Sequence, residues 1–144
     1  MGLKRYEPLP AELLKRKRGL SGLGLVCVND IKKGKTIVEY AGKRVNDAKA
    51  DTLSNRYIFE VKKNVNIDGS SRKNLARYVN HSCRPNCDYS TRKSGRVFYY
   101  ALKNIKAGEE LTVDYGKDYF EHYIGPHGCK CGAKKHRHQP RKKK

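Results

Sequence analysis

The chain has 144 residues and a formal net charge of +19, with 33 Lys and Arg residues against 14 Asp and Glu. That length is typical of one domain with a hydrophobic core of its own. It contains no 18-residue apolar run and no apolar N-terminal signal segment, so we expect neither a transmembrane helix nor a secretion signal.

Short apolar and β-branched runs predict strands over residues 24–28, 36–40, 57–61, 65–67, 87–91, 96–102 and 111–113. A short helix is predicted over 47–53, and a single helical turn over 74–78. Residues 92–95 predict a hairpin turn, in which Gly95 can take a positive φ. Segments of this length indicate a mostly β protein with few short helices, and periodicity alone favours a sandwich or barrel.

The segment 77–87 differs in character from the strands around it. It contains two cysteines, a histidine and two asparagines around Pro85, and Asn, Ser and Pro favour turns. A tight polar segment between apolar stretches indicates a site. On the residues alone, Asn80 could cap a buried turn, and His81 could be a general base or a metal ligand.

The run Asn80-His81-Ser82-Cys83 resembles the signature of the SET-domain protein lysine methyltransferases. Other marks of that family occur in the family's order: Gly22-Leu23-Gly24, Glu39-Tyr40-Ala41-Gly42, then Leu111-Thr112-Val113-Asp114-Tyr115-Gly116. The resemblance implies small curved β-sheets around a pseudoknot, in which the chain near Tyr115 threads the 80–83 segment. It divides the chain into an N-terminal segment (1–15), a SET domain (16–117), a post-SET zinc-binding segment (118–138) and a basic tail (139–144).

The resemblance implies a protein-lysine N-methyltransferase that uses S-adenosylmethionine as methyl donor. By the same resemblance the catalytic residues are Tyr115, Tyr40 and Tyr57, and the donor-binding residues are Ser21, Gly22, Leu23, Gly24, Tyr57, Asn80 and His81. We rank donor binding by Asn80 and His81 ahead of a structural turn and of a general base. Without the resemblance, a Gly-x-Gly run is more often an ordinary turn before a strand.

Two positions depart from the family pattern. Relatives often carry a larger or cationic residue where Leu23 stands, so a polar contact from that side chain is absent here. Phe or Tyr is common where Val113 stands, two residues before the catalytic tyrosine. Val is smaller, which leaves room for an already methylated amine unless neighbours fill the space.

The segment Cys129-Lys130-Cys131-Gly132-Ala133-Lys134-Lys135-His136 resembles the post-SET zinc motif of trithorax-type enzymes, with His as the last ligand. The implied zinc ligands are Cys83, Cys129, Cys131 and His136, with His138 as the alternative histidine; without zinc, Cys129 and Cys131 would be free surface thiols. We expect Cys27 and Cys87 to be buried apolar thiols. The odd number of cysteines and their spacing suit metal better than disulfides, which indicates a reducing, intracellular compartment.

The net charge of the chain indicates which binding partners it could attract. Removing the seven Lys and Arg after Gly132 still leaves a net charge of +12, so the basic character is not confined to the tail. Such a charge either attracts polyanions or forms only a solvated, soluble surface. The expected partner is a lysine-containing protein, histone or otherwise DNA-associated, with non-specific nucleic-acid contact as a further expectation. A basic substrate requires either a local acidic groove, built from Glu60, Asp68 and Asp88, or a target already bound to a polyanion.

Two other functions compete with the enzyme. One is a basic zinc-containing nucleic-acid-binding module without catalysis, which charge alone supports. The other is a SET fold that has lost activity, against which the joint presence of Asn80, His81 and the three tyrosines argues. We expect a free-standing minimal methyltransferase, nuclear in a eukaryote or in a host, and cytoplasmic in a bacterium.

Overall fold

A computed structural model of the chain describes residues 5–19 and 22–116. Its strands are β1 (Leu14–Gly19), β2 (Gly22–Cys27), β3 (Thr36–Tyr40), β4 (Lys43–Val45), β5 (Ile58–Lys62), β6 (Val65–Asp68), β7 (Asn80–His81), β8 (Cys87–Thr91), β9 (Val97–Ala101) and β10 (Thr112–Val113). One short helix, α1 (Asp47–Thr52), and two 3₁₀ turns, η1 (Ala11–Leu13) and η2 (Leu75–Tyr78), complete the described elements. The prediction of a mostly β fold with few short helices is therefore confirmed.

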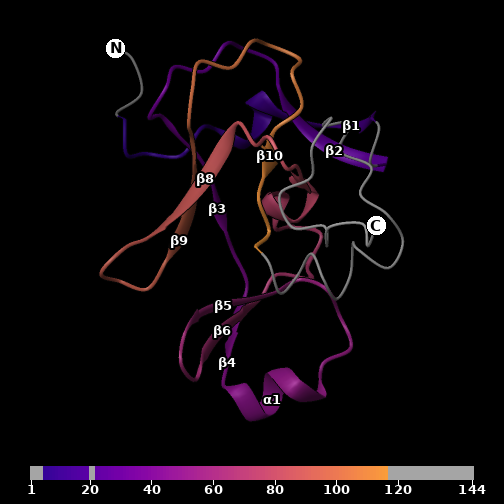
Figure 1. Cartoon of the computed structure of the whole chain (residues 1–144), viewed down its shortest axis with the longest axis vertical. Helices are drawn as coiled ribbons and strands as arrows, with labels where there is room; N and C mark the ends of the chain where they lie inside the picture. The colour runs from indigo at the N-terminus through magenta and orange to yellow at the C-terminus, as the bar shows by residue number, and fades with distance from the viewer. Residues whose placement is uncertain (1–4, 20–21, 117–144) are drawn as a thin grey trace, which may run out of the picture.

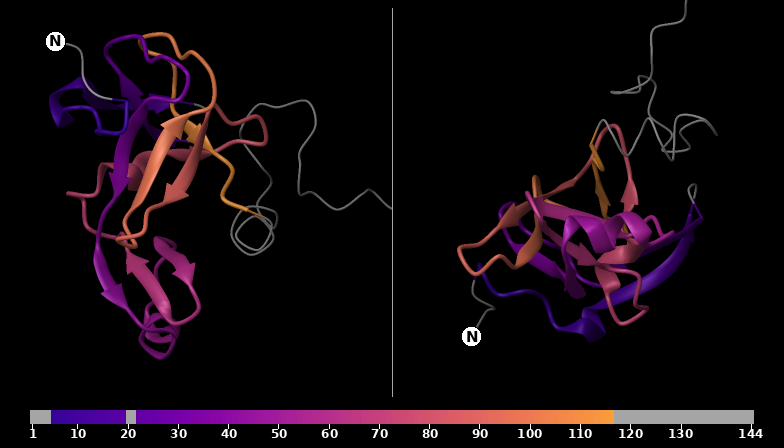
Figure 2. Two further views of the ribbon diagram at one scale, coloured as in Figure 1. Left: turned by 90° about the vertical axis from the view of Figure 1, so that its left-hand side faces the viewer. Right: turned by 90° about the horizontal axis from the view of Figure 1, so that it is seen from below.

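The strands form three small sheets rather than one sandwich or barrel (Figure 1). β1 and β2 make an antiparallel hairpin, and the largest sheet has the order β3-β9-β8-β10-β7. β4, β6 and β5 form the third sheet, which lies with α1 at one end of the molecule, below the largest sheet in both Figure 1 and the left view of Figure 2. The first and third sheets thus flank the five-stranded sheet.

Most predicted elements occur within a residue or two of their expected bounds. The 92–95 turn joins β8 to β9, with a hydrogen bond of 2.8 Å from the Gly95 amide to the Arg92 carbonyl and φ of 85° at Gly95. α1 begins as expected, because the Asn46 side chain accepts a hydrogen bond from the Lys49 amide at 2.8 Å and caps the helix. β1, β4 and β7 were not predicted, since none of them shows alternating apolar residues.

The chain crosses itself at β10. This strand lies between β7 and β8, parallel to both, and pairs Val113 with His81 on one side and with Cys87 on the other. The Ser82 amide donates to the Val113 carbonyl at 3.0 Å, and the Thr112 amide donates to the Asn86 side chain at 2.8 Å. The segment before Tyr115 is therefore held against the 80–87 segment from both sides, as the family resemblance implied.

A continuous core supports this crossing. Fully buried side chains include Leu25, Ile37, Val97, Leu111 and Val113, which come from β2, β3, β9 and the segment around β10. Leu111 and Val113 alternate with less buried neighbours, as expected of a strand with one buried face. No helix among residues 5–19 and 22–116 is long and apolar enough to cross a membrane.

Candidate active site

The three tyrosines predicted to be catalytic line one cavity of about 500 Å³. Tyr40 ends β3, Tyr57 directly precedes β5, and Tyr115 follows β10, so three separate parts of the chain supply them. The complete lining is Tyr40, Arg56, Tyr57, Ile58, Phe59, Glu60, Ala76, Arg77, Tyr89, Tyr99, Val113, Asp114, Tyr115 and Gly116. The cavity thus lies where the largest sheet meets the three-stranded sheet.

Backbone carbonyls fix two of these phenols. The Tyr40 hydroxyl donates to the Tyr57 carbonyl at 2.6 Å, and the Tyr115 hydroxyl donates to the Val79 carbonyl. The first bond joins two of the three tyrosine positions directly. The second ties the residue after the crossing to the end of η2, so both rings have fixed orientations.

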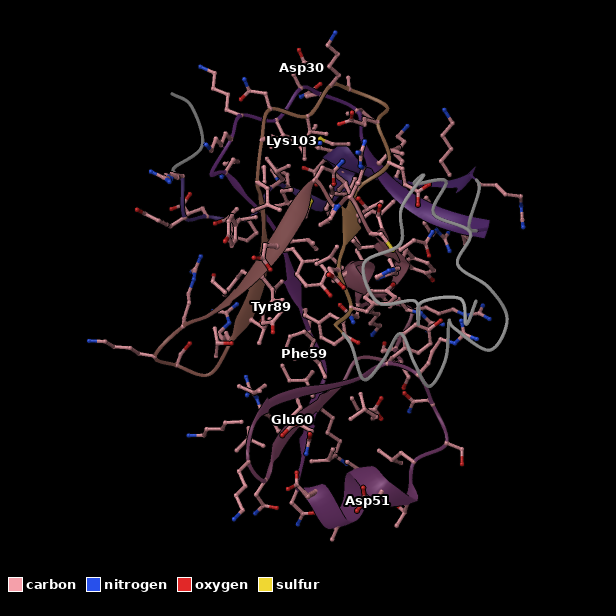
Figure 3. All side chains as sticks on the ribbon, in the orientation of Figure 1. Asp30, Asp51, Phe59, Glu60, Tyr89 and Lys103 are labelled. Carbon is pink, nitrogen blue, oxygen red and sulfur yellow. The ribbon has the colours of Figure 1, made fainter. Side chains whose placement is uncertain are left out.

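Aromatic rings form a continuous wall of the cavity. Phe59 lies 5.1 Å from Tyr40 and 5.0 Å from Tyr89, measured between ring centroids, and Tyr99 lies 6.0 Å from Tyr40. Figure 3 shows Phe59 and Tyr89 facing each other from β5 and β8. Burial raises the pKa of Tyr99 well above its usual value, so this phenol stays neutral at any physiological pH.

The charged residues in the lining balance. Arg56 and Arg77 face Glu60 and Asp114 around the same cavity, although the whole chain carries +19. A cationic substrate side chain therefore meets no net positive lining among the described residues.

Among the described residues, the three carboxylates considered for a local acidic groove (Glu60, Asp68 and Asp88) do not line one cavity together. Only Glu60 lines the cavity, whereas Asp88 lines a separate hollow with Lys103. The Asp68 carboxylate accepts hydrogen bonds from Ser70 and Asn55. Burial raises the pKa of Asp68, but those hydrogen bonds outweigh it and leave the pKa below its usual value. Asp68 is thus a structural carboxylate of the 55–70 region.

Arg77 is a cavity residue that the sequence did not single out. Its guanidinium lies over the Tyr57 ring at 4.2 Å from the centroid, and it also donates to the Ser70 carbonyl. Its Nε is buried and has no hydrogen-bond partner among the described residues. A buried unpaired donor is costly, so this atom is suited to meeting an acceptor on a bound molecule.

Asn80 links the segment predicted to bind the methyl donor to the chain crossing at β10. Its Nδ2 donates to the Leu23 carbonyl at 3.2 Å and to the Glu110 carboxylate at 2.9 Å. Glu110 itself lies against glycine backbone, since a Cβ at Gly24 would stand 2.7 Å from its Oε2, and one at Gly19 would stand 2.6 Å from its Oε1. These glycines leave room for the close approach of Glu110, which the sequence did not reveal.

The other predicted donor-binding residues differ in environment. Gly22 has φ of 92°, and a Cβ there would meet no atom of the described residues within 4 Å, so among them its backbone is open to a bound molecule. The Leu23 side chain is exposed. Ser21 lies outside the described residues.

His81 is held inside the crossing. Its Nδ1 accepts a hydrogen bond from the Tyr115 amide at 3.1 Å and lies 3.7 Å from the Asp114 carboxylate. Its Nε2 lies 3.5 Å from the Cys83 sulfur. An imidazole whose Nδ1 accepts an amide proton is neutral and protonated at Nε2, so we interpret His81 as a residue that positions the backbone of Tyr115 rather than as a general base.

The predicted zinc site lies mostly outside the described residues. Of its ligands only Cys83 is described, and it is buried beside His81; Cys129, Cys131, His136 and the alternative His138 are not described. Within the described part of the chain, no group of three or more His, Cys, Asp and Glu residues could hold a metal. Cys27 and Cys87 are buried as expected, and burial raises the pKa of the Cys87 thiol to about 12.

Comparisons with known proteins agree with this geometry. The SET-domain family matches residues 22–116. The histone-lysine N-methyltransferase trithorax of Drosophila virilis is 37% identical over 81% of this chain, which is 3% of that protein. The human histone-lysine N-methyltransferase described as H3 lysine-36 specific is 37% identical over 78% of this chain and 4% of its own length.

A fungal relative shows the same pattern. The H3 lysine-4 specific histone-lysine N-methyltransferase of Chaetomium globosum is 34% identical over 85% of this chain and 13% of its own length. The chain therefore spans only a small part of the length of these curated relatives, and the similarity concerns the region that contains the crossing and the cavity.

Proposed function

Because the chain belongs to the SET-domain family, we propose that it is a protein-lysine N-methyltransferase that transfers a methyl group from S-adenosylmethionine to a lysine amine. The observation that carries the proposal is the convergence of Tyr40, Tyr57 and Tyr115 on one cavity. The glycine segment at Gly22–Gly24 is tied to the same crossing through Asn80.

The cavity suits the amine that must react. A protonated lysine has no lone pair and an ordinary pKa of about 10.4, so it must lose a proton before it can attack. Removal of the amine from water lowers that pKa, because an apolar environment disfavours the charged form. The aromatic wall of Tyr40, Phe59 and Tyr99 offers an apolar surface to the aliphatic part of a lysine.

The phenols orient the amine. A phenol oxygen can accept a hydrogen bond while its proton is donated elsewhere. Tyr40 and Tyr115 donate to backbone carbonyls and can in this way accept from the amine, which fixes the direction of its lone pair. Orientation of this kind lowers a barrier by several kcal/mol. We assign the largest part to Tyr115, because the crossing holds its backbone.

The described residues fit the methyl donor. The donor, when bound, supplies a methyl group on a positively charged sulfur. Among the described residues, the open backbone at Gly22 and the exposed position of Leu23 leave room for it. We propose that Ser21, Gly22, Leu23, Gly24, Tyr57, Asn80 and His81 hold it, with Asn80 and His81 fixing the backbone around it.

We further propose a zinc ion held by Cys83, Cys129, Cys131 and His136. Three thiolates and one imidazole are an ordinary tetrahedral set for zinc. Cys83 is buried two residues after His81, and its sulfur lies 3.5 Å from His81 Nε2, which suits a residue that supports a metal ligand. Zinc there would join the 118–138 segment to the crossing that positions Tyr115.

The substrate that we propose is a lysine of a histone or another DNA-associated protein. Three relatives from fly, human and fungus carry names of histone-lysine methyltransferases. The balanced charge of the cavity lining is compatible with a basic peptide. In a eukaryote such a substrate places the protein in the nucleus.

Incubation with labelled methyl donor tests the proposal against the alternative of a nucleic-acid-binding module. Histones, DNA-binding proteins and free lysine peptides serve as acceptors, and mass spectrometry locates the modified side chain. We expect label on lysine nitrogen. Donor binding to zinc-loaded protein without any transfer would favour a SET fold without activity, and absence of donor binding would favour the nucleic-acid module.

A further inference from the structure

β1 carries an uninterrupted run of four cations. Lys15, Arg16, Lys17 and Arg18 are consecutive in this strand, and all four are exposed. None of them lies within 4.0 Å of a carboxylate among the residues that the structure describes. The strand thus exposes four charges that the described protein surface does not neutralise.

The partner strand leaves this charge intact. β2 has the sequence Gly-Leu-Gly-Leu-Val-Cys and pairs with β1 from Leu14↔Cys27 to Gly19↔Gly22, so no acidic residue stands opposite a cation. Glu110 approaches the same hairpin, but its carboxylate lies against the backbone of Gly19 and Gly24 and accepts a hydrogen bond from Asn80. It therefore lies against the backbone of the hairpin and is held by Asn80, and among the described residues it makes no ion pair with a β1 cation.

An extended strand spaces its cations regularly. Residues two apart point to the same face and lie about 7 Å from each other, so Lys15 and Lys17 form one pair and Arg16 and Arg18 the other. β1 pairs only with β2 and is an edge strand. A regular row of cations on an accessible edge matches a polymer with closely spaced negative charges, such as the phosphate backbone of nucleic acid.

We propose that β1 binds the phosphate backbone of double-stranded DNA. A duplex carries a negative charge per about 1.7 Å of its axis, so several phosphates lie within reach of a row of four cations. Proteins that bind single strands add exposed aromatic side chains for base stacking. The exposed aromatic residues among the described ones are Tyr6 and Tyr89, and neither belongs to the hairpin, so a backbone contact to a duplex fits better.

This contact goes beyond the proposed catalytic function and complements it. β2, the direct partner of β1, contains the segment that we propose to hold the methyl donor. DNA held on β1 would therefore lie beside the site, and a DNA-associated protein would reach the enzyme at high local concentration. The net charge of +19, which repels a free basic substrate, would then favour the encounter.

Charged residues on an edge strand can also serve only to prevent strands of different molecules from pairing. The two roles differ in measurable ways. Neutral polar residues in place of the cations would cause association of the protein if the charges only protect the edge. They would weaken DNA binding without association if the charges contact phosphate.

The test compares two full-length variants with equal charge. One is Lys15→Gln/Lys17→Gln/Arg18→Gln, which spares Arg16 because its guanidinium lies 5.5 Å from the Tyr78 ring centroid. The control is Lys49→Gln/Lys62→Gln/Lys63→Gln, which removes three exposed lysines from α1 and the β5–β6 hairpin at the other end of the molecule (Figure 1). Both variants carry +16. Binding of a short DNA duplex is measured over a range of salt concentrations.

We expect the β1 variant to bind DNA at least tenfold more weakly near physiological salt. Its plot of log affinity against log salt should be shallower by about 2–3, since each lost phosphate contact removes about 0.9 from the slope. The control should keep the wild-type slope and most of the affinity. Equal losses in the two variants, an unchanged β1 variant, or binding to anionic lipid vesicles without binding to DNA would overturn the proposal.

Methyl transfer separates this proposal from the catalytic one. Both variants should methylate a free peptide like the wild type, since neither touches the cavity. Loss of DNA binding with intact peptide methylation supports both proposals. If no variant and no wild-type sample methylates any peptide, the proposed activity fails, while the DNA measurement still decides the role of β1.

Discussion

The link between Asn80 and the Gly22–Gly24 segment can be broken by Asn80→Ala. The substitution removes the 3.2 Å hydrogen bond to the Leu23 carbonyl and the 2.9 Å bond to the Glu110 carboxylate. A neutral hydrogen bond contributes about 1 kcal/mol and one to a charged group about 1.5–3 kcal/mol. Since Asn80 and Glu110 are partly exposed, we expect a total near the lower end, about 2 kcal/mol.

This loss should be visible in two measurements. For a domain of this size, about 2 kcal/mol lowers the melting temperature by roughly 6 °C. Calorimetric titration with the methyl donor should show about tenfold weaker binding, because the Leu23 backbone is no longer held. The stability measurement reports the hydrogen bonds, and the titration reports their role in donor binding.

Asn104→Ala is the matched control. Asn104 is exposed and accepts one hydrogen bond from the Lys33 amide at 2.9 Å, remote in sequence from both parts of the link. We expect a smaller change in stability and unchanged donor affinity. Full donor affinity in Asn80→Ala, or an equal loss in Asn104→Ala, would refute the link.

Three further predictions concern Gly24, the Cys87 thiol and the zinc ligands. Gly24→Ala places a Cβ 2.7 Å from the Glu110 carboxylate, so it should destabilise the protein by about 1–3 kcal/mol in denaturant titration; wild-type stability would contradict the close approach. The Cys87 thiol, with its pKa raised to about 12, should resist alkylation at pH 8 in the native protein but react after unfolding, as mass spectrometry can show. Keeping this thiol neutral stabilises the fold below about pH 8.5, and that contribution is lost as the pH rises toward 12. Metal analysis should find zinc in protein purified without chelator. His136→Ala should reduce the zinc content while His138→Ala should not; an equal loss of zinc in His138→Ala would mean that His136 is the wrong choice of ligand.

Local patterns in the sequence predicted most of the strands and one helix. The alternation around Leu111 and Val113 predicted β10, and Gly95 in a short polar run predicted the β8–β9 hairpin. β1 was missed because Lys15–Arg18 has no apolar alternation, and its strand form results from pairing with β2. Propensity within one segment does not report a partner that another segment supplies.

The residues of the candidate site could likewise be predicted only in part. The three tyrosines could be chosen because they stand in recognisable runs. Arg77 and Glu110 could not be chosen in this way, because their distinguishing features are spatial. Arg77 has a buried Nε without a partner among the described residues, and the Glu110 carboxylate lies against glycine backbone. The environment of Asp68 could not be predicted for a related reason, since its carboxylate accepts hydrogen bonds from its own loop.

The most direct test of the central claim is the rate of methyl transfer to a lysine peptide by Tyr115→Phe, with Tyr100→Phe as control. Tyr115 lines the cavity, whereas Tyr100 on β9 does not, and both substitutions remove one phenol oxygen. We predict that Tyr115→Phe lowers the turnover by about tenfold or more while donor affinity changes little, because positioning of the amine is lost. Tyr100→Phe should retain the wild-type rate. Wild-type turnover in Tyr115→Phe would contradict the account.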